Sequence, residues 1–164
     1  MFNSFVAYNN IVPLVAPVDV ADNNTATGYI DLKGIHNCAF LVYVGLLTSA
    51  TALDNLPVTV EAATAVDGTE VQVDFSYRKA TAAGTNVWGA VTSASVVTLY
   101  ASVDDGILLW IEVDVDGCAA SDYRYVRVNV NPTDLAACLV SCVAITNPRY
   151  RQTTMTTATA SASV

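Results

Sequence analysis

The chain has 164 residues, of which 53% are hydrophobic and 13% are charged, and its formal net charge is −8. This length fits a single domain, alone or with arms, that buries a core without needing a metal or a disulfide. The excess of carboxylates argues against nucleic acid as a partner. No apolar run approaches the ~20 residues that span a bilayer, so we expect no membrane contact either.

Residues 1–27 carry Pro13, Pro17 and scattered apolar side chains, without a sustained period of either kind of secondary structure. We expect an extended N-terminal arm that lies on the domain itself or on a neighbouring subunit, with a partly ordered terminus as the alternative. Residues 1–10 lack the positive and apolar regions of a signal peptide, which favours a protein made in the cytoplasm.

Strand-like segments follow at roughly ten-residue spacing, with turn residues between them. In chain order they are residues 29–33, 39–47, 56–62, 70–78, 87–91, 95–103, 107–115, 122–131 and 135–145. Residues 39–47 are almost continuously apolar, which is the pattern of a strand covered on both faces. Residues 135–145 fit a helix or a strand, and their β-branched side chains favour the strand.

Residues 107–131 hold the strongest pattern in the chain. An apolar run passes into strict alternation, the pair Asp116-Gly117 supplies a turn, and alternation resumes after it. This arrangement predicts an antiparallel hairpin at the centre of the fold, with outer faces that match in charge. The residues that would face one another are Arg124 and Arg127 on the second run and Glu112 and Asp114 on the first.

No long amphipathic helix separates these segments. The pattern therefore predicts an all-β fold, an antiparallel two-sheet sandwich of jelly-roll type, over residues 28–148. The last segment, residues 149–164, is mostly Thr, Ser and Ala and cannot bury enough apolar area to order itself alone. We expect it to be an extended C-terminal arm, either disordered or laid on a partner.

Few residues suggest chemistry. The single histidine, His36, excludes any site that needs two, and a nucleophile pair with Cys38 or Cys118 has no cleft marked beside it. The four cysteines lack the paired spacing of a zinc site, and we expect them to be reduced and mostly buried. A cation site built from carboxylates is the closest alternative. Its ligands would be Asp104, Asp105, Asp114 and Asp116, of which the last two are also explained as a solvated strand face.

Aromatic side chains offer a second kind of site, a stacking platform for carbohydrate. The candidates are Trp88, Tyr100, Trp110, Tyr123 and Tyr125. Trp110 lies inside an apolar run, so we interpret it as part of the core. Tyr123 and Tyr125 flank an arginine, and Tyr and Arg are enriched at protein interfaces, so an interface patch is favoured over a glycan site.

Two stretches carry a resemblance to a known family. Residues 28–47 read GYIDLKGIHNCAFLVYVGLL and residues 123–132 read YRYVRVNVNP, with a turn, a strand and an Asp-Gly hairpin between them. This order resembles head decoration (cement) or auxiliary capsid proteins of tailed bacteriophages. The resemblance implies a β-sandwich, commonly trimeric, that binds the outside of a major capsid lattice and has no catalytic residues.

We therefore expect a non-enzymatic virion protein without a cofactor, which stabilises a phage capsid through contacts with the major capsid protein. It would also associate with itself, a trimer being favoured, because partners tend to cover an apolar, weakly charged surface. The alternative is a receptor- or carbohydrate-binding module of a phage head or tail. The residues predicted to lie at interfaces are Phe2, Phe5, Tyr8, Tyr123, Arg124, Tyr125, Arg149 and Tyr150.

Overall fold

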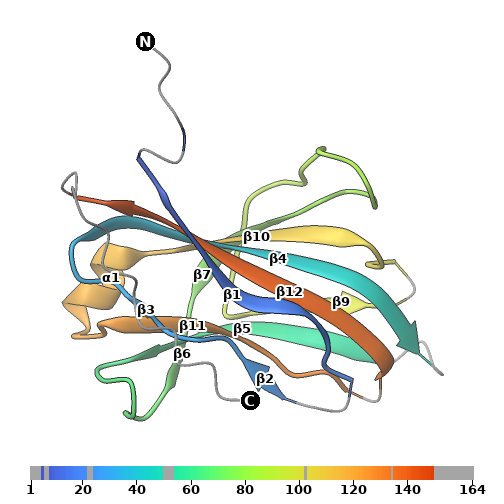
Figure 1. Cartoon of the computed structure of the whole chain (residues 1–164), viewed down its shortest axis with the longest axis horizontal. Helices are drawn as coiled ribbons and strands as arrows, with labels where there is room; N and C mark the ends of the chain where they lie inside the picture. Colours follow the sequence, from blue (N-terminus) through green and yellow to red (C-terminus); the bar gives the residue numbers. More distant parts are fainter. Residues whose placement is uncertain are drawn as a thin grey trace.

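The computed structural model of the chain describes residue 5 and residues 8–21, 24–49, 54–101, 103–133 and 135–149. Within them, two antiparallel sheets of six strands, sheet A and sheet B, stack into a sandwich. Figure 1 shows one sheet above the other, with their strands crossing obliquely. The predicted all-β, two-sheet sandwich is therefore confirmed.

Sheet A has the strand order β1-β12-β4-β10-β7-β8. Its strands are β1 (Asn10–Asp19), β4 (Ile35–Ser49), β7 (Phe75–Lys79), β8 (Thr92–Ala94), β10 (Ile107–Val113) and β12 (Leu135–Pro148). The two long strands β4 and β12 pair along almost their whole length and form the middle of the sheet. The segment that fitted either a helix or a strand is thus a strand, as its β-branched residues indicated.

Sheet B has the order β2-β11-β5-β6, with β3 also paired to β11 and β9 also paired to β5. Its strands are β2 (Thr25–Ala26), β3 (Ile30–Asp31), β5 (Asn55–Ala63), β6 (Val71–Val73), β9 (Val96–Tyr100) and β11 (Tyr125–Val130). The inward side chains of both sheets form one core. The residues that are 0% exposed in its centre include Phe40, Val42, Val44, Val58, Val60, Leu109, Ile111, Val126 and Val128.

The predicted hairpin over residues 107–131 is wrong. β10 belongs to sheet A, where it pairs with β4 and β7, whereas β11 belongs to sheet B, where it pairs with β2, β3 and β5. Alternation correctly marks Ile111 and Val126 as buried. It cannot tell whether two alternating runs lie side by side in one sheet or cover the same core from opposite sheets, because both arrangements bury the same residues.

The turn expected at Asp116-Gly117 is instead a short helix, α1 (Val115–Ala120). Asp114 caps its N-terminus, since its Oδ1 accepts a hydrogen bond from the Gly117 N–H at 3.0 Å. The helix ends at Ser121, and Asp122 follows with a left-handed φ of 61°. Figure 1 shows α1 at one end of the sandwich, where it carries the chain from sheet A to sheet B. A tight hairpin turn joins neighbouring strands only.

Part of the expected N-terminal arm lies on the domain itself. β1 forms the edge of sheet A and runs antiparallel to β12. Pro13 and Pro17 suit an edge strand, because they lack the N–H that a further strand would need. The end of β1 is held by Asp19, whose Oδ1 accepts a hydrogen bond from the Cys138 N–H at 2.9 Å.

The two ends of the chain are only partly described. Phe2 and Tyr150 lie outside the described residues. Of the predicted arm 149–164, Arg149 alone lies within them.

Candidate interaction surface

The side of sheet A that faces away from sheet B is lined by apolar residues. A row of aligned side chains crosses five strands, each opposite the next: Pro13 on β1, Val143 on β12, Leu41 on β4, Trp110 on β10 and Arg78 on β7. Cross-strand partners in a sheet point to the same face. Four of the five strands therefore present an apolar side chain in this row.

Two parallel rows flank the first one. The first of them consists of Ile11, Ile145, Ala39, Glu112 and Ser76. The second consists of Ser141, Tyr43 and Leu108. We call these three rows, together with Leu139, the outer face of sheet A. Leu139 lies over Gly45 of β4, where an added Cβ would come within 3.2 Å of the leucine Cβ.

The outer face of sheet A exposes large apolar side chains to solvent. Ile11 is 47% exposed, Tyr43 is 46% exposed and Leu139 is 40% exposed. In the three rows, the central strands β4 and β12 contribute no charged side chain. A contiguous apolar patch of this kind marks a contact site on a soluble protein. The pattern predicts that residues 39–47 are covered on both faces, but the described part of the chain covers their outward side only partly.

The charged residues of this face lie on one border. Glu112 accepts a hydrogen bond from the Trp110 indole at 2.8 Å. Arg78, opposite Trp110, is the one arginine of the described residues with no carboxylate partner. Trp, Tyr and Arg are the side chains most enriched at the energetic centres of protein interfaces, and this face holds one of each. Trp110 was predicted to lie in the core, but it is only half-buried and points outward.

A hollow of about 690 Å³ adjoins the face, between the loop of residues 81–90 and the side chains of Tyr43 and Leu108. In Figure 1 this loop rises from β7 beyond β10, on the side of sheet A away from sheet B. The loop rests on Gly106, where an added Cβ would approach the Ala83 Cβ at 3.1 Å. The outer face of sheet A is therefore bounded by a raised wall along one edge.

The outer face of sheet B has the opposite character, because its charges pair with one another. Arg127 lies opposite Glu61 and binds its Oε2 at 2.7 Å, and it also binds Glu70 at 3.1 Å. Tyr29 donates to Glu70 at 2.8 Å, and the Arg127 guanidinium lies 4.8 Å from the Tyr29 ring centroid. Asn129 completes the network with a hydrogen bond to Glu61 at 2.9 Å.

The pKa values of this network follow from its contacts. Burial and the hydrogen bond to Glu70 raise the pKa of Tyr29 to about 12. The same hydrogen bond lowers the pKa of the Glu70 carboxyl, with a smaller contribution from Arg127. The predicted pairing of Arg124 or Arg127 with Glu112 or Asp114 is wrong, because Glu112 lies on β10 of sheet A and Asp114 caps α1.

The predicted interface residues Tyr123, Arg124 and Tyr125 lie where β11 begins. Arg124 makes a two-pronged contact with Asp31, with an Nε···Oδ1 distance of 2.9 Å. This contact lowers the pKa of Asp31. The Tyr125 ring packs edge-on against Tyr29, with centroids 6.2 Å apart. Arg124 and Tyr125 are thus engaged within the chain, while Tyr123 is half-buried beside α1.

The other described residues of the predicted interface lie at the same end of the sandwich. Arg149 binds Asp116 of α1 at 2.6 Å. The side-chain amide of Asn147, near the end of β12, donates to the Tyr8 carbonyl at 3.0 Å. Phe5 and Tyr8 are 59% and 49% exposed. The structure therefore gathers residues from both ends of the chain and from β11 around the α1 end.

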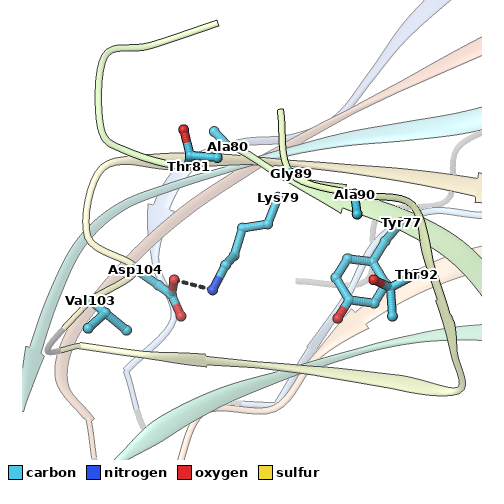
Figure 2. A pocket seen from close by; sticks show the side chains of 9 residues that line it. All are labelled: Tyr77, Lys79, Ala80, Thr81, Gly89, Ala90, Thr92, Val103 and Asp104. Carbon is cyan, nitrogen blue, oxygen red and sulfur yellow. Dashed lines mark hydrogen bonds and ion pairs between the residues drawn. The ribbon is translucent and has the colours of Figure 1, made fainter. Parts of the chain in front are cut away.

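A pocket of about 360 Å³ opens at the edge of the sandwich, between β7 and the loop after β9. Figure 2 shows Lys79 reaching across it to Asp104, at an Nζ···Oδ1 distance of 2.6 Å. The Asp104 side chain is 3% exposed, and its other oxygen accepts from the Tyr100 N–H at 3.0 Å. This ion pair joins β7 of sheet A to the loop that follows β9 of sheet B. The lining residues include no histidine or cysteine that would serve as a nucleophile or base.

The cysteines are placed for packing rather than chemistry. All four are buried and unpaired, as predicted from the sequence. Burial, and to a lesser degree the neighbouring Cys118 and Cys142, raises the pKa of Cys38 to about 12, while His36 is exposed. A thiol that is neither ionised at neutral pH nor accessible is a poor nucleophile.

The four aspartates considered for a cation lie far apart. Asp104 and Asp105 precede β10, whereas Asp114 and Asp116 follow it. The seven residues of that strand span roughly 23 Å. One cation therefore cannot bind all four carboxylates, and no group of metal-ligating side chains occurs in the described part of the chain.

The aromatic residues considered for carbohydrate do not share one surface. Trp110 lies on the outer face of sheet A, whereas Tyr123 and Tyr125 lie at the α1 end of sheet B. Trp88 lies in the loop beyond β7, where it forms an isolated antiparallel β-bridge with Ala80. A stacking platform needs neighbouring rings, so this alternative has no support from the arrangement.

Comparison with family models, with curated proteins and with solved structures finds no match for this chain. Among the described residues, no helix is long and apolar enough to cross a membrane.

Proposed function

We propose that this chain is a non-enzymatic structural protein of a virion. It is made in the host cytoplasm, and it decorates and stabilises a phage capsid through contacts with other copies and with the major capsid protein. The observation that carries the proposal is the outer face of sheet A. This face is an exposed apolar patch on one sheet of the sandwich, and patches of this kind mark sites of contact with other molecules.

Two further observations support this reading. The charged side chains of sheet B are paired within the chain, so they serve the fold rather than a substrate. The residues that could perform acid–base or nucleophilic chemistry do not meet at one place. Cys38 is buried and His36 is exposed, while Lys79 and Asp104 form an ion pair with each other. A catalytic site needs such groups to meet in one pocket.

The test uses empty heads assembled from the major capsid protein of the same genome. The purified full-length chain is mixed with the heads and centrifuged through a sucrose gradient. We expect the chain to sediment with the heads at a fixed ratio to the capsid protein and to raise the temperature at which the heads rupture. A chain that stays at the top of the gradient at saturating concentration contradicts the proposal.

A further inference from the structure

We propose that the outer face of sheet A is the contact between two copies of this chain, packed face to face about a two-fold axis. The inference rests on the proposed function, which includes a contact between copies and a contact with the capsid shell. We assign the outer face of sheet A to the contact between copies and expect the shell to bind a different surface. Strand β4 gives the first reason. Its inward side chains, such as Phe40, are covered by sheet B. Of its outward side chains, Leu41 is only half-buried and Tyr43 is 46% exposed.

A second sheet is the partner whose shape fits this face. Two sheets pack about 10 Å apart with interdigitating side chains, which is how the inward face of sheet A is already covered. The outward rows on β12 and β4 offer the same kinds of side chain, including Val143, Ile145 and Leu41. The same face of another copy is such a sheet, and it has the same lack of charge at its centre.

The charges of the face favour a second copy as the occupant. Each chain carries a net charge of −8, so two copies repel one another wherever carboxylates meet. In the three rows of this face, Arg78 and Glu112 are the only charged side chains, and they lie diagonally on neighbouring strands. In an isologous contact, residue i meets residue j and j meets i. A two-fold axis that sets Arg78 against Glu112 of the second copy forms this ion pair twice.

The size of the face sets the expected strength of the contact. Six residues on each of the four strands β1, β12, β4 and β10 cover roughly 400 Å² at the usual strand spacing and rise. That footprint is about half of the ~800 Å² that each partner of a standard-size interface buries, so we expect weak association, with a dissociation constant on the order of micromolar or higher. Two-fold pairing gives an even-numbered assembly, in contrast to the trimer that the resemblance favours.

The experiment measures the mass of the full-length chain by light scattering over a range of concentrations spanning the micromolar. We expect a monomer–dimer equilibrium in which Leu41→Glu weakens association at least tenfold. The matched control is Val96→Glu, which places the same charge on the outer face of sheet B, at a position 39% exposed, and leaves the equilibrium unchanged.

Charge reversal tests the pairing itself. Arg78→Glu and Glu112→Arg should each weaken the dimer, and the double variant should restore it, because the reversed charges meet again across the axis. A trimer that Leu41→Glu does not affect overturns the inference, as does a double variant that fails to restore association.

A chain that is monomeric at every concentration also overturns it. Acrylamide quenching of Trp110 fluorescence, in a Trp88→Phe background, then reports whether another segment of the same chain covers the face. If the monomer binds empty heads and Leu41→Glu abolishes that binding, the face belongs to the shell contact. That result overturns the two-fold contact while leaving the proposed function intact.

Discussion

The outer faces of the two sheets differ in the side chains that they present to solvent. Sheet B turns arginines and carboxylates outward and pairs them, as Arg127 does with Glu61 and Glu70. Sheet A turns Ile11, Tyr43, Leu139 and their neighbours outward and leaves them 40–47% exposed. Neither choice alters the core, because outward side chains point away from it. The difference therefore reports on what each face meets after folding.

The paired charges of sheet B serve the monomer, because their partners come from the same chain. The apolar rows of sheet A are only partly covered by the described residues, and we propose that a second copy covers them. Four experiments, two on substitutions and two on titrations, distinguish the roles of the two faces.

The largest expected effect compares the two sides of β4. Phe40→Ala removes a side chain that is 0% exposed and should lower the free energy of unfolding by about 3–5 kcal/mol. Leu41→Ala, one residue along on the outer face, should lower it by less than about 1 kcal/mol at concentrations where the chain is monomeric. Urea unfolding of dilute protein measures both. Equal losses would mean that the outer face is part of the folding core.

A smaller effect compares two arginines. Arg127→Ala leaves Glu61 and Glu70 without their cation in a half-buried network, and we expect a loss of about 1–2 kcal/mol of unfolding free energy. Arg78→Ala is the matched control on sheet A and should change stability by no more than about 0.5 kcal/mol, while it weakens the dimer. Thermal unfolding at two protein concentrations distinguishes the outcomes. If the two variants were equally destabilised, the contrast between the faces would fail.

The next prediction concerns alkaline pH. Folding raises the pKa of Tyr29 from 10.0 to about 12, so the folded state holds this proton more tightly than the unfolded chain. The resulting stabilisation is complete below pH 10 and is lost as the pH rises towards 12. Spectrophotometric titration should show a late-ionising tyrosine that is absent in Tyr29→Phe. Identical titration curves for the two proteins would contradict the buried network.

The smallest effect concerns acid. Arg124 lowers the pKa of Asp31 below its ordinary value of 3.8, so the folded state binds fewer protons there than the unfolded chain. The contribution of this pair to stability is present above that pH and is lost as the pH falls through the lowered value. In the Arg124→Gln variant, the pKa of the Asp31 carboxyl, measured by NMR titration, should be higher than in the original protein. An unchanged pKa would show that the contact does not persist in solution.

The sequence was informative wherever the signal was local. Period-two alternation identified the buried side of β10 and β11, and the continuous apolar run at residues 39–47 marked a strand near the middle of sheet A. That run also contained the signal for the outer face, because both of its sides are apolar. It was interpreted as a strand covered on both faces, which placed Leu41 and Tyr43 inside the protein.

Non-local pairing was the part that the sequence could not supply. The sequence predicts Arg124 or Arg127 opposite Glu112 or Asp114 because the two runs are close in the chain, yet Arg127 binds Glu61, 66 residues away. The turn at Asp116-Gly117 was a reasonable reading of its residue types, but Asp114 uses the same glycine N–H to cap a helix. Local chemistry was compatible with both structures, and only the position of the next strand decided between them.

What the sequence determined by itself is the class of fold, the identity of most buried residues and the buried state of the cysteines. These depend on side-chain period and hydrophobicity, which each segment carries alone. The tertiary structure alone decided which strands share a sheet, which charges meet, and that Trp110, Leu41 and Val143 align on one outward face. Those properties depend on strand order, and strand order is set by the packing of distant segments around one core, which no short stretch of sequence encodes.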